Sequence, residues 1–237
     1  MTTAVVVAAA GRGDRLGPGV PKALRELAGE PLLVHAVRSL VAAPSVDLVL
    51  VAAPSDQVAT VRAMLSDVVP DRVGLVVVAG GSSRTESVRR ALEVLPADVE
   101  IVLVHDAARA LVPAALVESV VAAVRAGAGA VVPGLPVADT IKTVDDAHVV
   151  TATVDRSALW SVQTPQGFRR VVLAAAHEAA AHDTSPGTPE ATDDAGLVER
   201  IGGRVLVVPG SDEAFKVTRP LDLILAEAVL AARGETR

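Results

Sequence analysis

The chain has no cysteine, and its only aromatic residues are Trp160, Phe168 and Phe215. Without thiols it can form no disulfide, no thiolate zinc site and no thiol nucleophile, and a cysteine-free chain fits the cytoplasm. Because aromatic side chains are so scarce, the core of these 237 residues must be built from valine, leucine, alanine and isoleucine. A chain of this length can bury enough apolar surface to need no covalent cross-link.

An excess of positive charge is also lacking, since the net charge is −6. That balance argues against binding of nucleic acid over a broad surface. No uninterrupted apolar run approaches the ~18 residues of a membrane-spanning helix, and Met1–Val7 lacks the basic segment of a signal peptide. We therefore expect neither a nucleic-acid partner nor a membrane partner, and we interpret this N-terminal stretch as the first buried strand.

Short apolar runs alternate with amphipathic segments along the first half of the chain. Strands that are apolar on both faces are typical of a parallel sheet covered by helices, and the segments between them repeat apolar residues near the helical period. The predicted fold class is therefore α/β, a doubly wound and mostly parallel sheet within a single domain of residues 1–237. Strands are expected over residues 4–8, 46–52, 73–79, 100–105 and 129–133, and helices over residues 31–41, 57–68, 84–95 and 114–126.

The alternation breaks at Leu135, and residues 136–154 become extended on both sides of a turn at residues 145–148. This pattern predicts a protruding β-hairpin arm. Because an isolated hairpin is marginally stable in water, we expect the arm to pack on a second copy in a homodimer. Beyond it the sheet is expected to resume near Val162 and at residues 205–208, with helices over residues 170–181, 195–201 and 221–232 and a surface loop over residues 182–192.

The segment from Ala8 to Leu16, followed by Pro21 and Lys22, has the composition of a phosphate-binding loop. Its small side chains let backbone N–H groups approach an anion, and Arg15 and Lys22 offset the negative charge. It is not a Walker loop, because no Gly-Lys-Ser/Thr triplet follows, and Leu16 stands at the third glycine of the dinucleotide fingerprint. The alternative interpretation is an ordinary strand-to-helix turn.

A second polar cluster, His105–Arg109, follows a predicted strand, at the end where ligands of such sheets bind. Asp106 is well placed to hold Mg²⁺ together with substrate phosphates, although a carboxylate that caps the next turn is the alternative. His105 is expected to be a packed residue. For Arg109 two interpretations are equally favoured: a cation with a functional role, or a structural ion-pair partner of Asp106.

A third cluster, Gly80–Val88, also follows a strand and opens a helix. Its glycines and hydroxyls favour a pocket that recognises a flat base through backbone and hydroxyl groups, with Arg84 orienting the loop. Ser83 and Glu86 also fit a helix capping box, whatever else the loop does.

Later positions add two cations and a helix cap. Arg156, at the base of the arm, has a guanidinium that matches phosphate oxygens. Lys216 stands among apolar neighbours and is expected to have an anionic partner, for which we favour a substrate phosphate. Thr192–Ala195 places acidic residues at a helix N-terminus, where they most simply cap the helix, and a metal or substrate role is the alternative. Thr218 is predicted to cap the last helix.

In order and spacing, these motifs resemble the 2-C-methyl-D-erythritol 4-phosphate cytidylyltransferases of the non-mevalonate isoprenoid pathway. The resemblance runs over about residues 5–230. The motifs that carry it are Ala9-Ala10-Gly11 with Arg15 and Pro21-Lys22, Gly80-Gly81 with Arg84 and Ser87-Val88, His105-Asp106-Ala107-Ala108-Arg109, Asp139-Thr140-Ile141-Lys142, Thr164-Pro165-Gln166, and Lys216-Val217-Thr218-Arg219-Pro220.

The resemblance implies a Rossmann-like nucleotidyltransferase fold, a homodimer, and transfer of a cytidylyl group from CTP to methylerythritol 4-phosphate with Mg²⁺. The acceptor phosphate would attack the α-phosphorus in line, and catalysis would consist of positioning and electrostatic stabilisation. The implied catalytic residues are Arg15, Lys22 and Lys216; Asp106 would bind Mg²⁺; Ala9, Ala10, Gly11, Gly81, Ser82, Ser87 and Ala107 would bind the nucleotide; and Thr140 and Arg156 from the partner's arm, with Lys216, would bind the acceptor.

Two positions depart from the family pattern. Ala110 stands where proline is frequent, and Ser82 stands where some members carry an acid that accepts from the cytosine amino group. The alternatives that stay open are the same chemistry on ribitol 5-phosphate, another sugar-phosphate nucleotidylyltransferase that uses UTP or GTP, a non-catalytic nucleotide-binding protein, and a dimeric structural protein that uses only the arm.

Overall fold

The computed structural model describes residues 1–11, 21–183 and 191–234. Its centre is a sheet in the order β10-β7-β11-β6-β1-β4-β5, with β12 paired to β7. The pairs β6–β1, β1–β4, β4–β5 and β7–β12 are parallel, whereas β10 and β11 run antiparallel to their neighbours. The sheet strands are β1 (Thr2–Ala8), β4 (Leu48–Ala53), β5 (Gly74–Ala79), β6 (Val99–Asp106), β7 (Ala130–Pro136), β10 (Trp160–Val162), β11 (Gln166–Arg169) and β12 (Val205–Pro209).

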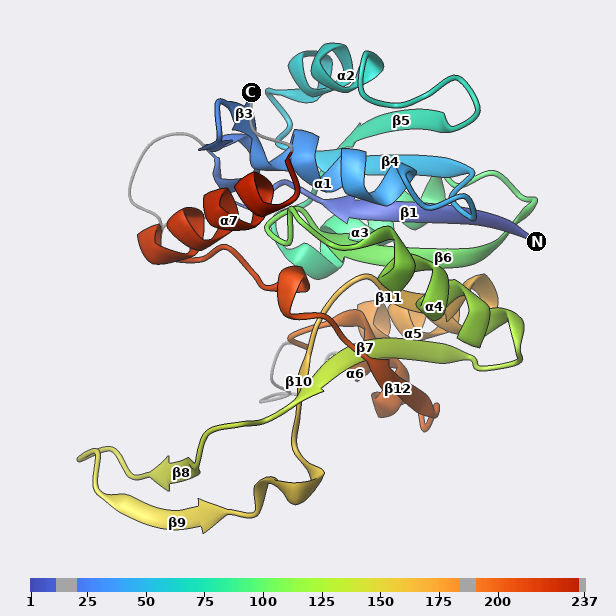
Figure 1. Cartoon of the computed structure of the whole chain (residues 1–237). Helices are drawn as coiled ribbons and strands as arrows, with labels where there is room; N and C mark the ends of the chain where they lie inside the picture. The colour runs from blue at the N-terminus through green and yellow to red at the C-terminus, as the bar shows by residue number, and fades with distance from the viewer. Residues whose placement is uncertain (12–20, 184–190, 235–237) are drawn as a thin grey trace.

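Helices cover both faces of this sheet, as the predicted doubly wound fold requires (Figure 1). Every helix predicted from the apolar period is present, with ends that differ from the prediction by at most two residues. No helix among the described residues is long and apolar enough to cross a bilayer. The helices are α1 (Leu32–Val41), α2 (Val58–Ser66), α3 (Arg84–Glu93), α4 (Ala114–Arg125), α5 (Arg170–His182), α6 (Asp194–Arg200) and α7 (Pro220–Ala232).

The two faces of the sheet bury separate apolar clusters, which explains the nearly continuous apolar runs in the sequence. Val5 and Val7 of β1 pack with α1, α2 and α4, whereas Ala4 and Val6 of the same strand pack with α3, α5 and α6. All four of these side chains have no exposed surface. Burial on both faces is the reason for the parallel-sheet pattern of the sequence.

The structure corrects the sequence prediction at two places. Strand β11 was not predicted, because Gln166-Gly167-Phe168-Arg169 contains a single large apolar side chain and no run of β-branched residues. The N-cap residue of the last helix is Arg219 and not Thr218, and the Asp222 carboxylate accepts from the N–H of Arg219 and from the N–H and hydroxyl of Thr218. Most of the loop predicted over residues 182–192 lies outside the described residues.

The predicted arm is a hairpin of β8 (Ile141–Val144) and β9 (Val150–Val154), which form a two-stranded sheet of their own. Figure 1 shows the hairpin standing clear of the central sheet, beyond the end of β7. Its turn is closed by the Asp145 carboxylate, which accepts from the N–H groups of Ala147 and Val149. Within the hairpin, apolar side chains such as those of Val144 and Val150 are more than half exposed.

Gly167 is the one position of β11 where the close approach of α4 excludes a side chain. A Cβ there would lie 2.5 Å from Cγ1 of Val120 and 3.1 Å from Cδ2 of Leu103. Valine is stiff at χ1, so neither element can give way without a shift of the backbone.

We therefore expect Gly167→Ala to lower the free energy of unfolding by about 1–3 kcal/mol, the usual cost of overpacking a core. Gly129→Ala is the matched control, because its Cβ would meet only Cγ2 of Val172, at 3.5 Å. Denaturant unfolding of both variants measures the difference. Equal stability of the two variants would show that β11 does not pack against α4 as described.

Candidate active site

The loops that leave β1, β5 and β6 meet at one edge of the sheet, as the three polar clusters predicted. The N–H of Ala9 donates to the Ala52 carbonyl at 3.0 Å, and that of Ala107 donates to the Ala8 carbonyl at 3.4 Å. Gly80 approaches the first loop so closely that a Cβ there would lie 2.4 Å from Cβ of Ala10. The edge of the sheet is therefore lined by small residues and backbone groups.

Asp106, the last residue of β6, lies at the centre of the charges at this edge. Its Oδ1 accepts from Nε of Arg84 at 3.0 Å, and its Oδ2 accepts from Nζ of Lys216 at 2.7 Å. Burial alone would raise the pKa of Asp106, but the two cations outweigh burial and hold that pKa well below its usual range. The carboxylate is therefore ionised at neutral pH. The anionic partner predicted for Lys216 is present, and within the chain it is Asp106.

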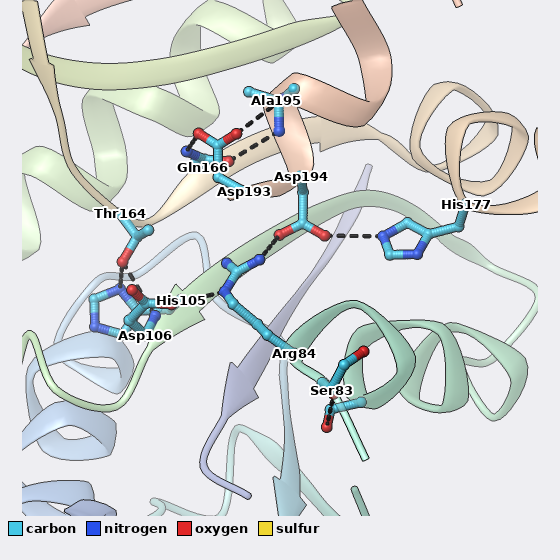
Figure 2. Close-up of polar contacts among 12 residues, drawn as sticks. Ser83, Arg84, His105, Asp106, Thr164, Gln166, His177, Asp193, Asp194 and Ala195 are labelled. Atoms are coloured by element: carbon cyan, nitrogen blue, oxygen red, sulfur yellow. Dashed lines mark hydrogen bonds and ion pairs between the residues drawn. The ribbon is translucent and has the colours of Figure 1, made fainter. Parts of the chain in front are cut away.

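Arg84 lies between two carboxylates, an arrangement that the sequence analysis missed (Figure 2). Its Nη1 donates to Oδ2 of Asp194 at 2.6 Å, and Oδ1 of Asp194 accepts from Nε2 of His177 at 2.8 Å. Burial by itself disfavours the guanidinium cation, but Asp194 and Asp106 outweigh it and raise the pKa of Arg84. The sequence favoured a capping role for Asp193 and Asp194, with a metal or substrate role as the alternative. Asp193 does cap α6, by accepting from the N–H of Gly196 at 2.9 Å.

The loop between β5 and α3 is held by hydroxyl groups. Ser83 caps α3 by accepting from the N–H of Glu86, but the Glu86 carboxylate accepts from the N–H and hydroxyl of Ser82, both at 2.6 Å, so the capping box is shifted by one residue. Hydrogen bonds from Ser82 lower the pKa of Glu86 to about 2. Ser87 is buried, and its Oγ accepts from the N–H of Gly81 at 2.9 Å. Ser87 thus fixes the backbone of Gly81.

His105 is a packed residue, as predicted, and its hydrogen bonds connect two neighbouring segments of the site. Its Nε2 donates to the Arg109 carbonyl at 3.1 Å, and Nδ1 accepts from the Thr164 hydroxyl, whose oxygen accepts in turn from the N–H of Asp106. Burial lowers the pKa of His105 to about 4, although the Asp106 carboxylate opposes the shift. The Arg109 guanidinium donates to the carbonyls of Ala214 and Val162, and these contacts favour a structural role.

The remaining predicted residues lie in three places. Arg15 falls outside the described residues. Lys22 begins a short helical turn (Lys22–Leu24) that follows the first loop. Gly11, in that loop, is exposed. Thr140 and Arg156 are both exposed and flank the pair Ile141–Val154, so they lie at the same end of the arm. The structure therefore groups Asp106, Lys216 and Arg84 at the sheet edge, and it groups Thr140 and Arg156 on the arm.

Comparison with known proteins identifies relatives over nearly the whole chain. Residues 3–232 match the family of 2-C-methyl-D-erythritol 4-phosphate cytidylyltransferases (IspD). The enzyme of that name from Streptomyces avermitilis is 56% identical, over 98% of this chain and 92% of its own length, and the one from Saccharopolyspora erythraea is 56% identical over 98% and 100%. The crystal structure of the Thermus thermophilus enzyme is 36% identical with a TM-score of 0.77, covering 98% of this chain and all of its own.

The buried His105 makes stability depend on pH in a defined window. The unfolded chain binds a proton on this imidazole below about pH 6.5, whereas the folded chain does so only near pH 4, so acid favours unfolding across that range. We expect the free energy of unfolding to fall by about 3 kcal/mol between those pH values. The carboxylates with lowered pKa values add to the loss below about pH 5, where they begin to bind protons in the unfolded chain but stay ionised in the folded one.

The measurement is urea unfolding from pH 7 to pH 4 of the wild type and of His105→Gln, which keeps a donor for the Arg109 carbonyl but does not titrate in this range. The variant should be less stable at pH 7 and should lose less stability on acidification. Parallel pH profiles would rule out the contribution of His105.

Proposed function

The chain belongs to the 2-C-methyl-D-erythritol 4-phosphate cytidylyltransferase family and transfers a cytidylyl group from CTP to 2-C-methyl-D-erythritol 4-phosphate; we propose that the transfer takes place at the carboxyl end of β6, beside Asp106. The products are 4-diphosphocytidyl-2-C-methyl-D-erythritol and pyrophosphate. Of the alternatives that the sequence left open, the family match favours this acceptor over ribitol 5-phosphate and an enzyme over a binding or structural protein.

The observation that carries this placement is the ion pair of Asp106 with Lys216. A lysine 2.7 Å from the carboxylate that anchors the nucleotide brings an acceptor phosphate next to the nucleotide phosphates. Two reactants held side by side react as if at very high local concentration, and this positioning adds to the electrostatic stabilisation that the cations supply. Lys216 would therefore bind the acceptor phosphate while Asp106 serves the nucleotide.

The donor set at Asp106 fits Mg²⁺ held chiefly by substrate. The described residues contain no group of three or more histidine and carboxylate side chains arranged for a metal. Mg²⁺ is commonly held by one or two carboxylates, with phosphate oxygens and waters completing its shell, and one ionised carboxylate at a phosphate site meets that requirement. When bound, the ion would lower the repulsion between the phosphate groups.

In the transfer, an oxygen of the acceptor phosphate forms a bond to the α-phosphorus of CTP, and the bond from that phosphorus to the bridging oxygen breaks. Pyrophosphate leaves with the electron pair. A phosphate monoester is already anionic near neutral pH, so the step needs no general base. Lys22, with Arg15, would stabilise the negative charge that develops on the triphosphate.

The base and ribose would lie over the small residues of the sheet edge. Ser87 accepts from the N–H of Gly81 and Glu86 accepts from the Ser82 hydroxyl, so the Gly81 carbonyl and the Ser82 oxygen are the groups that would accept from the cytosine amino group. Glu86 places a carboxylate directly beside Ser82, at the position where some relatives carry an acid. The residues that would form this pocket are Ala9, Ala10, Gly11, Gly81, Ser82, Ser87 and Ala107.

The arm of residues 136–154, part of a single domain of residues 1–237, would complete the acceptor site of a second copy. Its exposed apolar side chains and its lack of pairing to the main sheet support a homodimer. Arg156 and Thr140 of the partner's arm would then hold the acceptor phosphate, because a guanidinium matches phosphate geometry. The absence of cysteine supports a cytoplasmic location.

We expect Lys22→Ala to lower kcat by about 100-fold to 1,000-fold, the usual effect of removing one transition-state donor. The KM for CTP should change much less, because the charge that Lys22 stabilises develops mainly during transfer. Initial rates of pyrophosphate release over a range of CTP concentrations separate the two parameters. Turnover near that of the wild type would contradict the assignment.

The proposed arm exchange predicts complementation between two defective chains. Asp106→Asn and Arg156→Ala should each be poorly active at low acceptor concentration. Co-refolded mixtures should recover up to about a quarter of wild-type activity, because each mixed dimer holds one site with both residues intact. If Arg156 served the site of its own chain, both sites of the mixed dimer would stay defective and mixing would restore nothing.

A further inference from the structure

Asp194 is a buried carboxylate at a position where the sequence suggests a surface helix end. Its side chain is 1% exposed, although it is the first residue of α6. A charge removed from water requires compensating partners, and those of Asp194 come from two other helices: Nη1 of Arg84 in α3 at 2.6 Å and Nε2 of His177 in α5 at 2.8 Å. Asp193 already caps α6, so capping does not explain why the side chain of Asp194 points into the protein.

Arg84 connects this buried carboxylate to the candidate active site (Figure 2). One edge of its guanidinium donates to Asp194, and Nε donates to Oδ1 of Asp106 at 3.0 Å. Because the guanidinium is planar and rigid, the two carboxylates together fix its position. If Asp194 were lost, Asp106 would be the only one of these two carboxylates left to neutralise the Arg84 guanidinium.

The charges show what sharing the cation achieves. Two carboxylates, Asp106 and Asp194, are paired with two cations, Arg84 and Lys216, so the charges of these four side chains sum to zero, and Arg109 adds a further positive charge close to Asp106 and Arg84. Neutralising Asp194 would give the four side chains a net positive charge next to the oxygens of Asp106. A positive surplus at that distance repels a divalent cation and attracts a phosphate.

We propose that Asp194, held by His177, is a positioning residue for cytidylyl transfer: it takes one side of Arg84, so that Asp106 keeps enough negative charge to receive a divalent cation bound to the nucleotide. The inference rests on the proposed role of Asp106. A contribution to stability does not by itself explain the arrangement, because buried ion pairs are often no more stabilising than apolar side chains of similar volume.

The test compares Asp194→Asn with the wild type by calorimetric titration of CTP, without acceptor, in EDTA and in a series of Mg²⁺ concentrations. We expect the strengthening of CTP binding by Mg²⁺ to fall about 10-fold, while the affinity in EDTA is unchanged or higher. Asp193→Asn is the matched control: it removes a charge from the adjacent residue, which does not contact Arg84, and should respond to Mg²⁺ like the wild type. Equal weakening in EDTA and in Mg²⁺ would indicate structural damage and overturn the proposal.

Two further variants keep the test decisive if Asp194→Asn folds poorly. Arg84→Lys leaves Asp194 in place but cannot span both carboxylates, and it should lose the response to Mg²⁺ in the same way. In an Arg84→Ala background, Asp194→Asn should cause no further loss, because Asp194 acts only through Arg84. A full additional loss in the double variant would overturn the proposal.

Asp106→Asn separates this inference from the proposed function. If Asp106→Asn retains cytidylyl transfer and the response to Mg²⁺, the proposed site itself is wrong. If Asp106→Asn loses both while Asp194→Asn behaves like the wild type, only the positioning role of Asp194 is wrong.

Discussion

The ionised carboxylate of Asp106 holds together parts of the molecule that are far apart in sequence. The carboxylate joins the end of β6 to α3 through Arg84 and to the C-terminal segment through Lys216. The backbone N–H of Asp106 also donates to the Thr164 hydroxyl. Each partner approaches from a different side, so the carboxylate has little freedom to rotate. A site that works by positioning depends on such rigidity, because a displacement of about 1 Å can cost a large factor in rate.

The central sheet supplies the second constraint, because it determines which loops meet. β6, β1, β4 and β5 are adjacent and parallel, so the loops that follow them open at the same edge. Small residues on these loops have a packing reason as well as a functional one, as the contact between Gly80 and Ala10 shows. Strands β1, β4 and β6, largely buried and packed on both faces, keep this edge in place.

Periodicity predicted the helices, the parallel strands and the arm, because each has a repeating apolar pattern. It could not predict β11, whose burial comes from the fit of Gly167 against α4 and from Phe168. The motif at a strand end pointed to Asp106, and the apolar neighbours of Lys216 pointed to that lysine, but neither pattern revealed the contact between the two side chains. Asp194 was missed for a similar reason, since only the packing of α3, α5 and α6 turns an acidic helix start toward Arg84.

The two groups of predicted residues differ in how they are held, and this difference bears on how the site is assembled. Asp106 and Arg84 are fixed by buried contacts within one chain, whereas Thr140 and Arg156 stand exposed on a hairpin with no core of its own. A hairpin of this kind becomes rigid only when its apolar side chains are covered. If the covering surface is a second copy, the same contact that stabilises the dimer also immobilises the guanidinium that binds the acceptor. Dimer formation and acceptor binding would then be coupled through the arm, while the nucleotide side of the site would be complete within each chain.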